Sequence, residues 1–157
     1  MSNKEPERPL DIEHFFPYQL TQLQGIVSDC VAEIYTGEFD LTRDEWRVLA
    51  VLGSHNQLTA KALAPMINLE KMAISRAIKR MLANQLISKQ ADSVDKRAFQ
   101  LSLTEKGVAL RQQLIPKALV REQQLLSVLN EDEKSALNTI LKKLTIHSSG
   151  LLTNHNE

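Results

Sequence analysis

The spacing of apolar residues changes twice along the chain, and this limits the possible folds more than any other feature. Up to Leu86, apolar residues recur at intervals of three and four, as on one face of an α-helix. Between 98 and 103 every second residue is a large apolar one, which is the period of a β-strand. Helical spacing returns after Thr104. This pattern predicts a mostly α-helical fold that contains a small β-hairpin.

Capping signals and proline set the bounds of the expected elements. Thr42 and Glu45 have the spacing of a capping box at a helix start, and so do Asn130 and Glu133. Pro116 predicts a kink or a break in the helix that contains it. In chain order we expect helices at 13–36, 43–54, 60–67 and 70–84, strands at 87–92 and 98–103, and helices at 105–127 and 131–147.

Charge is distributed unevenly along the 157 residues, although 19 basic side chains balance 19 acidic ones. Residues 1–45 contain ten acidic and three basic side chains. Residues 57–110 contain nine basic and four acidic side chains, an excess of five positive charges. A local excess of this kind indicates an anionic partner even when the whole chain is neutral.

The expected helix at 70–84 divides into an apolar face and a basic face. Its apolar residues fall on one side, and no acidic residue follows Glu70 within it. A helix of this kind fits the major groove of B-DNA, where Arg and Lys donate to guanine or to phosphate. The alternative, a surface helix that is basic by chance, is disfavoured by its place between a helix–turn unit and a hairpin. The basic residues are Lys71, Arg76, Lys79 and Arg80.

Three charged residues, Asp95, Lys96 and Arg97, occupy the expected turn of the hairpin. Such a turn is either a solvated loop or a basic tip that touches an anionic partner. Because it follows the basic helix, we interpret residues 41–104 as a winged helix-turn-helix. In this interpretation Lys96 adds a phosphate contact, and Asp95 braces the wing because a carboxylate near phosphate is repelled.

Segments 41–49, 78–87 and 95–107 resemble the MarR family of bacterial transcription regulators, and the likeness extends over nearly the whole chain. Its most specific part is Asp95-x-Arg97 followed by the run that starts at Leu103 and ends at Gly107. The resemblance implies a winged helix-turn-helix flanked by N- and C-terminal dimerisation helices. The expected layout has flexible tails at 1–12 and 148–157, dimerisation helices at 13–40 and 105–147, and the DNA-binding region at 41–104.

The family resemblance also implies partners and site residues. The protein is expected to be a homodimeric repressor that binds a pseudo-palindromic operator in double-stranded DNA. Arg97 would enter the minor groove and Asp95 would hold the wing, often by pairing with that arginine. Members often bind small anionic or phenolic molecules, so an effector of this class is expected, with no binding residue marked. The family-like positions of the recognition helix are Lys71, Ser75, Arg76 and Lys79.

One position departs from the family pattern. Many members have a glycine before the apolar pair that ends the recognition helix, and here Gln85 precedes Leu86 and Ile87. A residue with a side chain must therefore end this helix.

Cys30, the one cysteine, lies on an apolar stripe, where it is either a buried structural residue or a redox sensor.

Other kinds of chemistry find no support in the sequence. The four histidines lack metal-ligand spacing, and we expect no metal, no cofactor and no enzymatic activity. There is no signal peptide and no apolar run long enough for a membrane helix, so a cytoplasmic location is expected. The alternative function is a winged helix that binds protein without operator binding. That function would require an exposed apolar face where the sequence places a cationic one.

Overall fold

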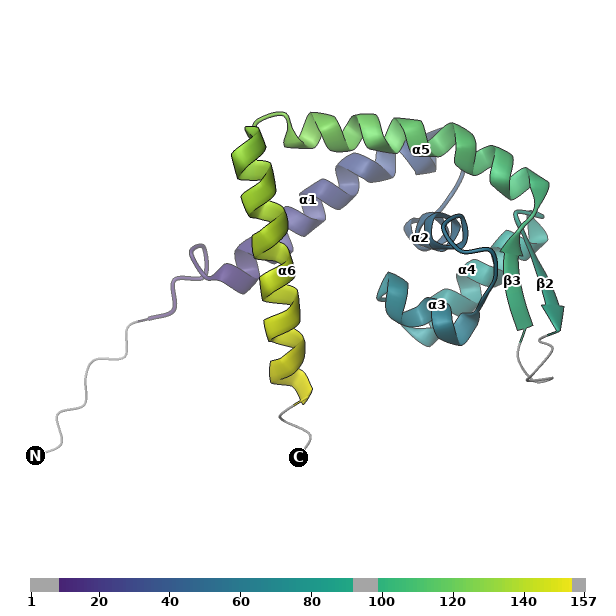
Figure 1. Cartoon of the computed structure of the whole chain (residues 1–157), viewed down its shortest axis with the longest axis horizontal. Coiled ribbons are helices and arrows are strands. Elements are labelled where there is room, and N and C mark those ends of the chain that lie inside the picture. Colours follow the sequence, from purple (N-terminus) through teal and green to yellow (C-terminus); the bar gives the residue numbers. More distant parts are fainter. Residues whose placement is uncertain (1–8, 92–98, 154–157) are drawn as a thin grey trace, which may run out of the picture. The chain divides into compact units, whose positions relative to one another are not determined.

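The computed structural model describes residues 9–91 and 99–153 of the chain (Figure 1). Contacts divide the chain after Leu119 into two compact units. In the described residues the elements are α1 (Phe16–Gly37), α2 (Arg43–Leu52), β1 (Leu58–Thr59), α3 (Ala60–Ile67), α4 (Lys71–Ala83), β2 (Ile87–Ala91), β3 (Phe99–Leu103), α5 (Glu105–Leu126) and α6 (Glu131–Thr153).

The expected fold class is confirmed, because a small antiparallel sheet lies among helices. β2 and β3 pair antiparallel, with Ile87 opposite Leu103 and Ala91 opposite Phe99. A third strand, β1, pairs with the other edge of β3 and gives the order β1-β3-β2. The sequence did not predict β1, because two residues are too short to show an alternating pattern.

Both predicted capping boxes are present. At the start of α2 the Thr42 side chain accepts a hydrogen bond from the Glu45 backbone N–H at 3.2 Å, and the Thr42 N–H donates to Glu45 Oε2 at 2.7 Å. At the start of α6, Asn130 Oδ1 accepts from the Glu133 N–H at 2.9 Å, and Glu133 Oε2 accepts from the Asn130 N–H at 2.8 Å. Each box satisfies two backbone donors that the first turn of a helix leaves unpaired.

The first and last helices have different limits from those expected. α1 begins at Phe16 instead of 13, because Asp11 forms a turn in which its carboxylate accepts from the Glu13 N–H at 3.2 Å. At the other end, α6 continues to Thr153 through residues expected to be a tail. Gly150 alone does not stop a helix, and the apolar spacing resumes beyond it at Leu151.

Of the kink or break expected at Pro116, the break does not occur, since α5 runs without interruption from Glu105 to Leu126, close to the helix expected at 105–127. A proline inside a helix removes one backbone hydrogen bond and costs about 3 kcal/mol. Packing next to the proline compensates for this cost. Leu114 is completely buried, and Ala118 packs against the same core.

The core of the first unit holds α4 by its apolar side. It includes buried side chains from α2, α3, α4, β3 and α5, among them Leu49, Leu63, Met81, Leu101 and Leu114. Tyr35 of α1 is also buried and stacks on Trp46 of α2, with ring centroids 6.0 Å apart. Because the core takes one side of α4, the opposite side faces solvent.

Candidate DNA-binding surface

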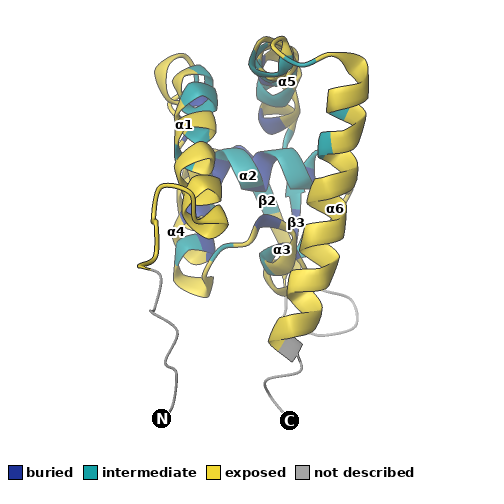
Figure 2. Ribbon diagram, turned by 90° about the vertical axis from the view of Figure 1, so that its left-hand side faces the viewer, coloured by how far each residue is buried: buried dark blue, intermediate teal, exposed yellow. Residues whose placement is uncertain are grey.

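α4 has one buried apolar face and one exposed basic face, as the sequence predicted. Ile74, Ala77 and Met81 are buried in the core. Each basic residue of the helix is exposed, and so are Ser75 and Met72. The ribbon of α4 in Figure 2 accordingly carries both buried and exposed colours. The helix therefore presents a row of cations and no carboxylate between Lys71 and Ala83.

Three of the four cations on α4 are available to a partner. Among the residues that the structure describes, Lys71, Arg76 and Lys79 make no ion pair and no hydrogen bond through their side chains. Like charges gathered on one helix face repel one another unless an anion lies against them. We name this surface, formed by Lys71, Ser75, Arg76 and Lys79, the cationic face.

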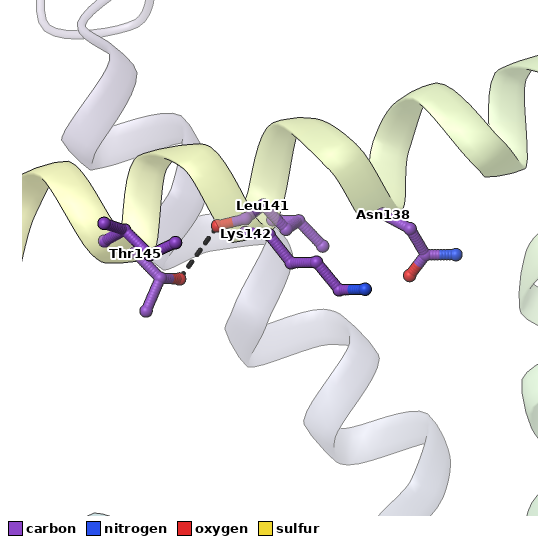
Figure 3. A pocket seen from close by; sticks show the side chains of 5 residues that line it. Asn138, Leu141, Lys142 and Thr145 are labelled. Carbon is purple, nitrogen blue, oxygen red and sulfur yellow. Dashed lines mark hydrogen bonds between the residues drawn. The ribbon is translucent and has the colours of Figure 1, made fainter.

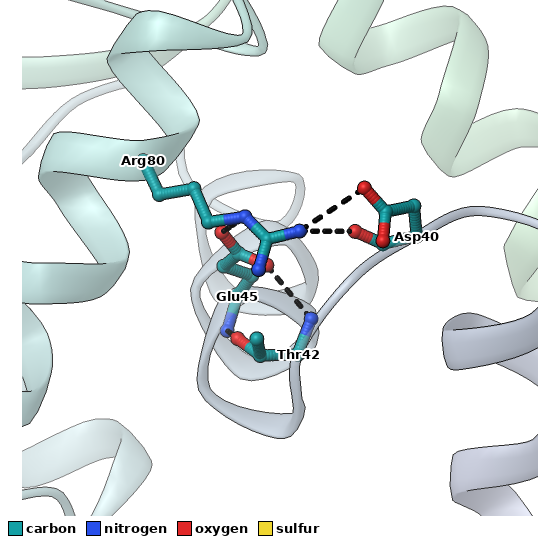
Figure 4. Close-up of polar contacts among 4 residues, drawn as sticks. All are labelled: Asp40, Thr42, Glu45 and Arg80. Carbon is teal, nitrogen blue, oxygen red and sulfur yellow. Dashed lines mark hydrogen bonds and ion pairs between the residues drawn. The ribbon is translucent and has the colours of Figure 1, made fainter.

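Arg80, predicted to bind DNA with the other three, differs from them in having partners within its own chain (Figure 4). Its guanidinium lies against two carboxylates of its own chain: Nε is 3.2 Å from Glu45 Oε1, and Nη2 is 3.1 Å from Asp40 Oδ2. Nη2 also donates to the Asp40 backbone oxygen at 3.0 Å. Both partners lie far away in the sequence, so helical spacing alone gives no signal of these contacts.

The turn that precedes α4 is built by a residue with a left-handed backbone. Asn68, which ends α3, has a φ of 48°, and asparagine tolerates this region better than most residues. At the start of α3, Thr59 accepts a hydrogen bond from the Ala62 N–H at 3.1 Å. The predicted short helix and turn are thereby confirmed, and together with α4 they form a helix-turn-helix.

The far end of α4 is joined to the start of α5 by three hydrogen bonds. The Thr104 side chain donates to the Gln85 carbonyl at 2.6 Å, and the Thr104 N–H donates to the Leu86 carbonyl at 3.1 Å. The Lys106 ammonium donates to the Asn84 carbonyl at 2.9 Å, where a cation also suits the negative end of a helix. We call this set of contacts the hairpin base.

Gln85 and Gly107 make the close approach at the hairpin base possible. Gln85 has a φ of 57°, so it turns the chain in the conformation for which a glycine is usual. A side chain on Gly107 would place Cβ 2.0 Å from the Leu86 carbonyl oxygen. Gly107 ends the segment that most specifically resembles the family, and its close approach to Leu86 gives a physical reason for a glycine there.

The wing is described only in its strands. On the described part, Lys89 of β2 lies over the ring of Phe99 of β3, 4.1 Å from the ring centroid, and the hydroxyls of Ser88 and Ser102 are 3.0 Å apart. The predicted wing residues Asp95, Lys96 and Arg97 lie outside the described residues. Their assigned roles therefore remain predictions.

Sequence reasoning missed the importance of Glu45 and Asp40 in this region. The sequence identifies Glu45 as a capping residue, but its side chain is also only 1% exposed and faces Arg80. The signal available in the sequence is indirect. A glutamate at the third position of a helix lies on the side of the following apolar residues Val48 and Leu49, which are buried.

Two other kinds of site are absent from the described residues 9–91 and 99–153. They contain no group of three or more His, Cys, Asp or Glu side chains that could hold a metal ion. None of their helices combines the length and the apolar character that crossing a bilayer requires. A hollow of about 320 Å³ lies along α6, but all five of its lining residues, including Leu141 and Lys142, belong to that one helix (Figure 3).

Comparison with known proteins agrees with the geometry. The model of the MarR family matches residues 41–99. The crystal structure of a MarR/EmrR family transcriptional regulator from Acinetobacter sp. ADP1 is 30% identical, with a TM-score of 0.81 over 90% of this chain and 99% of that one. The repressor NicR of Pseudomonas putida is 25% identical over 82% of this chain and 85% of its own length.

A more distant structure supports the fold alone. BpsR of Bordetella bronchiseptica is 20% identical, with a TM-score of 0.80 over 88% of this chain and 98% of its own. A helix–turn–helix with an outward cationic face, followed by an antiparallel hairpin, is a winged helix-turn-helix, the fold of these transcription regulators. Within that class, the chain belongs to the MarR family. Members of this family regulate transcription and are not enzymes.

Proposed function

We propose that this regulator is a homodimeric repressor that binds a specific operator in double-stranded DNA. The observation that carries the proposal is the cationic face of α4, whose side chains are exposed and unpaired among the described residues. Arg76 and Lys79 are the proposed contacts to bases or phosphates, with Lys71 and Ser75 at the helix start. We propose a cytoplasmic location, because the chromosome that a bacterial regulator binds lies in the cytoplasm.

The wing completes the proposed DNA contact. Arg97 is proposed to enter the minor groove, where width and negative potential favour arginine, and Lys96 to contact phosphate. Asp95 is proposed to brace the wing. These roles follow from the charge pattern and from membership of the family, because all three residues lie outside the described part of the chain.

A homodimer is supported by the apolar side chains that α1 and α6 expose. In α6 only Lys134 and Leu137 are partly covered, and all other residues from Glu131 to Leu152 are exposed (Figure 2). Soluble proteins seldom leave so much apolar surface without a partner. We propose residues 13–40 and 105–147, now extended to Thr153, as dimerisation helices and 41–104 as the DNA-binding region.

Two-fold symmetry determines the kind of operator. A dimer presents two copies of α4, and half-sites about 34 Å apart place both in successive major grooves on one side of DNA. The operator is therefore proposed to be pseudo-palindromic.

A small anionic or phenolic effector is proposed to change the affinity of this protein for its operator, by analogy with BpsR, whose DNA binding is regulated by 6-hydroxynicotinic acid.

Titration of DNA binding against salt tests this function. The protein is incubated with genomic fragments, the bound fragments are selected, and their affinity is measured by mobility shift. A dimer that makes about 6–10 phosphate contacts loses about 10³–10⁵ in affinity between about 50 and 200 mM salt. Absence of binding to any fragment at low salt would instead favour a winged helix that binds protein.

A further inference from the structure

Arg80 lies on the basic helix, yet its guanidinium lies against two carboxylates of its own chain (Figure 4). Its side chain is 43% exposed, and its guanidinium meets Glu45 of α2 and Asp40 of the α1–α2 joint. The other three cations of α4 have no such partners among the described residues. This contrast separates Arg80 from the cationic face.

Because the carboxylate of Glu45 is buried, its contact with Arg80 matters for the position of α4. Its carboxylate is almost fully buried, and Oε2 accepts a hydrogen bond from the Thr42 N–H at 2.7 Å. Oε1 accepts no hydrogen bond within the described residues, and its compensating charge is Arg80 Nε at 3.2 Å. A buried carboxylate without a cation is costly, so α4 is held in the position that keeps Arg80 beside it.

Asp40 adds a second, weaker connection that depends on backbone conformation. It lies between the end of α1 and Thr42, with a φ of 50°. Its carboxylate is 93% exposed, so the ion pair with Arg80 is screened by water. The backbone oxygen of Asp40, 3.0 Å from Arg80 Nη2, stays within reach only while the α1–α2 joint keeps this shape.

We propose that Arg80 is a positioning residue: it sets the placement of α4 through buried Glu45, couples α4 to the α1–α2 joint through Asp40, and makes no phosphate contact. The inference rests on the proposed DNA binding. It assigns the four basic residues of one helix to two roles, with three that meet DNA and one that holds the helix. Movement of α1 relative to α2 would then alter α4 through this contact.

The salt dependence of binding distinguishes the two roles of a basic residue. Loss of a phosphate contact lowers the slope of log affinity against log salt by about 0.9 for each contact. Loss of a positioning residue weakens binding and leaves that slope unchanged. Lys79→Gln is the matched variant for a DNA contact, because Lys79 precedes Arg80 and belongs to the cationic face.

The most informative variant is Glu45→Gln. Glutamine keeps the capping box, because its side-chain oxygen can still accept from the Thr42 N–H. With its oxygen on the Thr42 N–H, glutamine loses the negative charge beside Arg80 and turns an amide N–H group toward the guanidinium, so Arg80 is released. If Arg80 contacts phosphate directly, releasing it leaves operator affinity unchanged or increases it. If Arg80 positions α4, the same substitution weakens binding by about tenfold.

Asp44→Asn is the control, since Asp44 makes no ion pair among the described residues.

The full experiment measures operator affinity at several salt concentrations for the complete dimer, at a temperature where thermal unfolding shows each variant folded. We expect Arg80→Gln and Glu45→Gln each to weaken binding by about tenfold with the slope unchanged. The double variant should bind no more weakly than Arg80→Gln, because both act through one contact. Asp40→Asn, which keeps the backbone acceptor, should have a smaller effect.

Each result of this experiment supports or overturns the positioning role of Arg80. A reduced salt slope in Arg80→Gln, like that in Lys79→Gln, or unchanged affinity in Glu45→Gln, overturns the positioning role while operator binding stands. Failure of the unaltered protein to bind any genomic fragment overturns the proposed function and this inference together. If Arg80→Gln does not fold, the opposite expectations for Glu45→Gln still separate the two roles.

Discussion

Gly107 has no room for a side chain, because a Cβ there would lie 2.0 Å from the Leu86 backbone oxygen. Gly107→Ala is therefore expected to lower the free energy of unfolding by about 3 kcal/mol or more, since backbone on both sides would have to move. Chemical denaturation measures this loss. Gly25→Ala is the control: a Cβ at that position would meet nothing within 4 Å, and alanine should stabilise α1 by up to about 1 kcal/mol.

At the scale of elements, Gln85 ends α4 in a left-handed conformation that costs about 1–2 kcal/mol for a residue with a side chain. Gln85→Gly removes this strain and keeps the carbonyl that accepts from Thr104. Glycine also makes the unfolded chain more flexible, which offsets about 0.5–1 kcal/mol of the gain. We expect a net increase in stability of about 0.5–1 kcal/mol, measured as a higher urea midpoint.

The neighbouring residue provides the comparison for this substitution. Asn84 has a φ of −81°, which any residue adopts without strain. Asn84→Gly should therefore lower stability by about 0.5–1 kcal/mol through the unfolded state alone. Equal effects at both positions would show that the left-handed conformation of Gln85 carries no cost.

Local signals were sufficient to predict most elements. The capping boxes at Thr42 and Asn130 act within four residues, so the sequence alone placed the starts of α2 and α6. β1 was missed because its pairing with Leu101 depends on a strand about forty residues away. α5 was predicted as one helix, and the possible break at Pro116 is absent because tertiary packing outweighs a local breaker.

The sequence predicted the cationic face of the candidate site but not the contacts of Arg80. Helical spacing gave the cationic face of α4, because side-chain direction on a helix follows from residue number. Spacing could not show that Arg80 turns back toward Glu45 and Asp40, since both partners belong to other elements. Burial of a charged side chain is a property of the assembled core, and no local pattern reports it.

At the scale of the whole molecule, the apolar stripe of α6 tests the proposed dimer. Leu141 and Leu144 are exposed on one side of this helix. Leu141→Glu is expected to raise the dimer dissociation constant by about 100-fold or more, because a two-fold interface contains each substitution twice. Sedimentation velocity over a range of protein concentrations measures the change.

Thr139→Glu provides the control for the dimer prediction. Thr139 lies on the opposite side of α6 from Leu141, is exposed, and receives the same new charge. The dimer should persist in this variant. Dissociation in both variants, or in neither, would contradict a dimer interface formed by the Leu141 side of the helix.

The hairpin base has a consequence for how this protein can diverge. The chain leaves α4 and returns to α5 through residues bonded directly to each other, Gln85 and Leu86 on one side and Thr104 on the other. The two helices therefore keep their mutual placement whatever sequence joins the strands at the tip. If the wing contacts DNA as proposed, relatives can differ in the length and charge of the tip, and so in operator preference, while the two helices keep their placement.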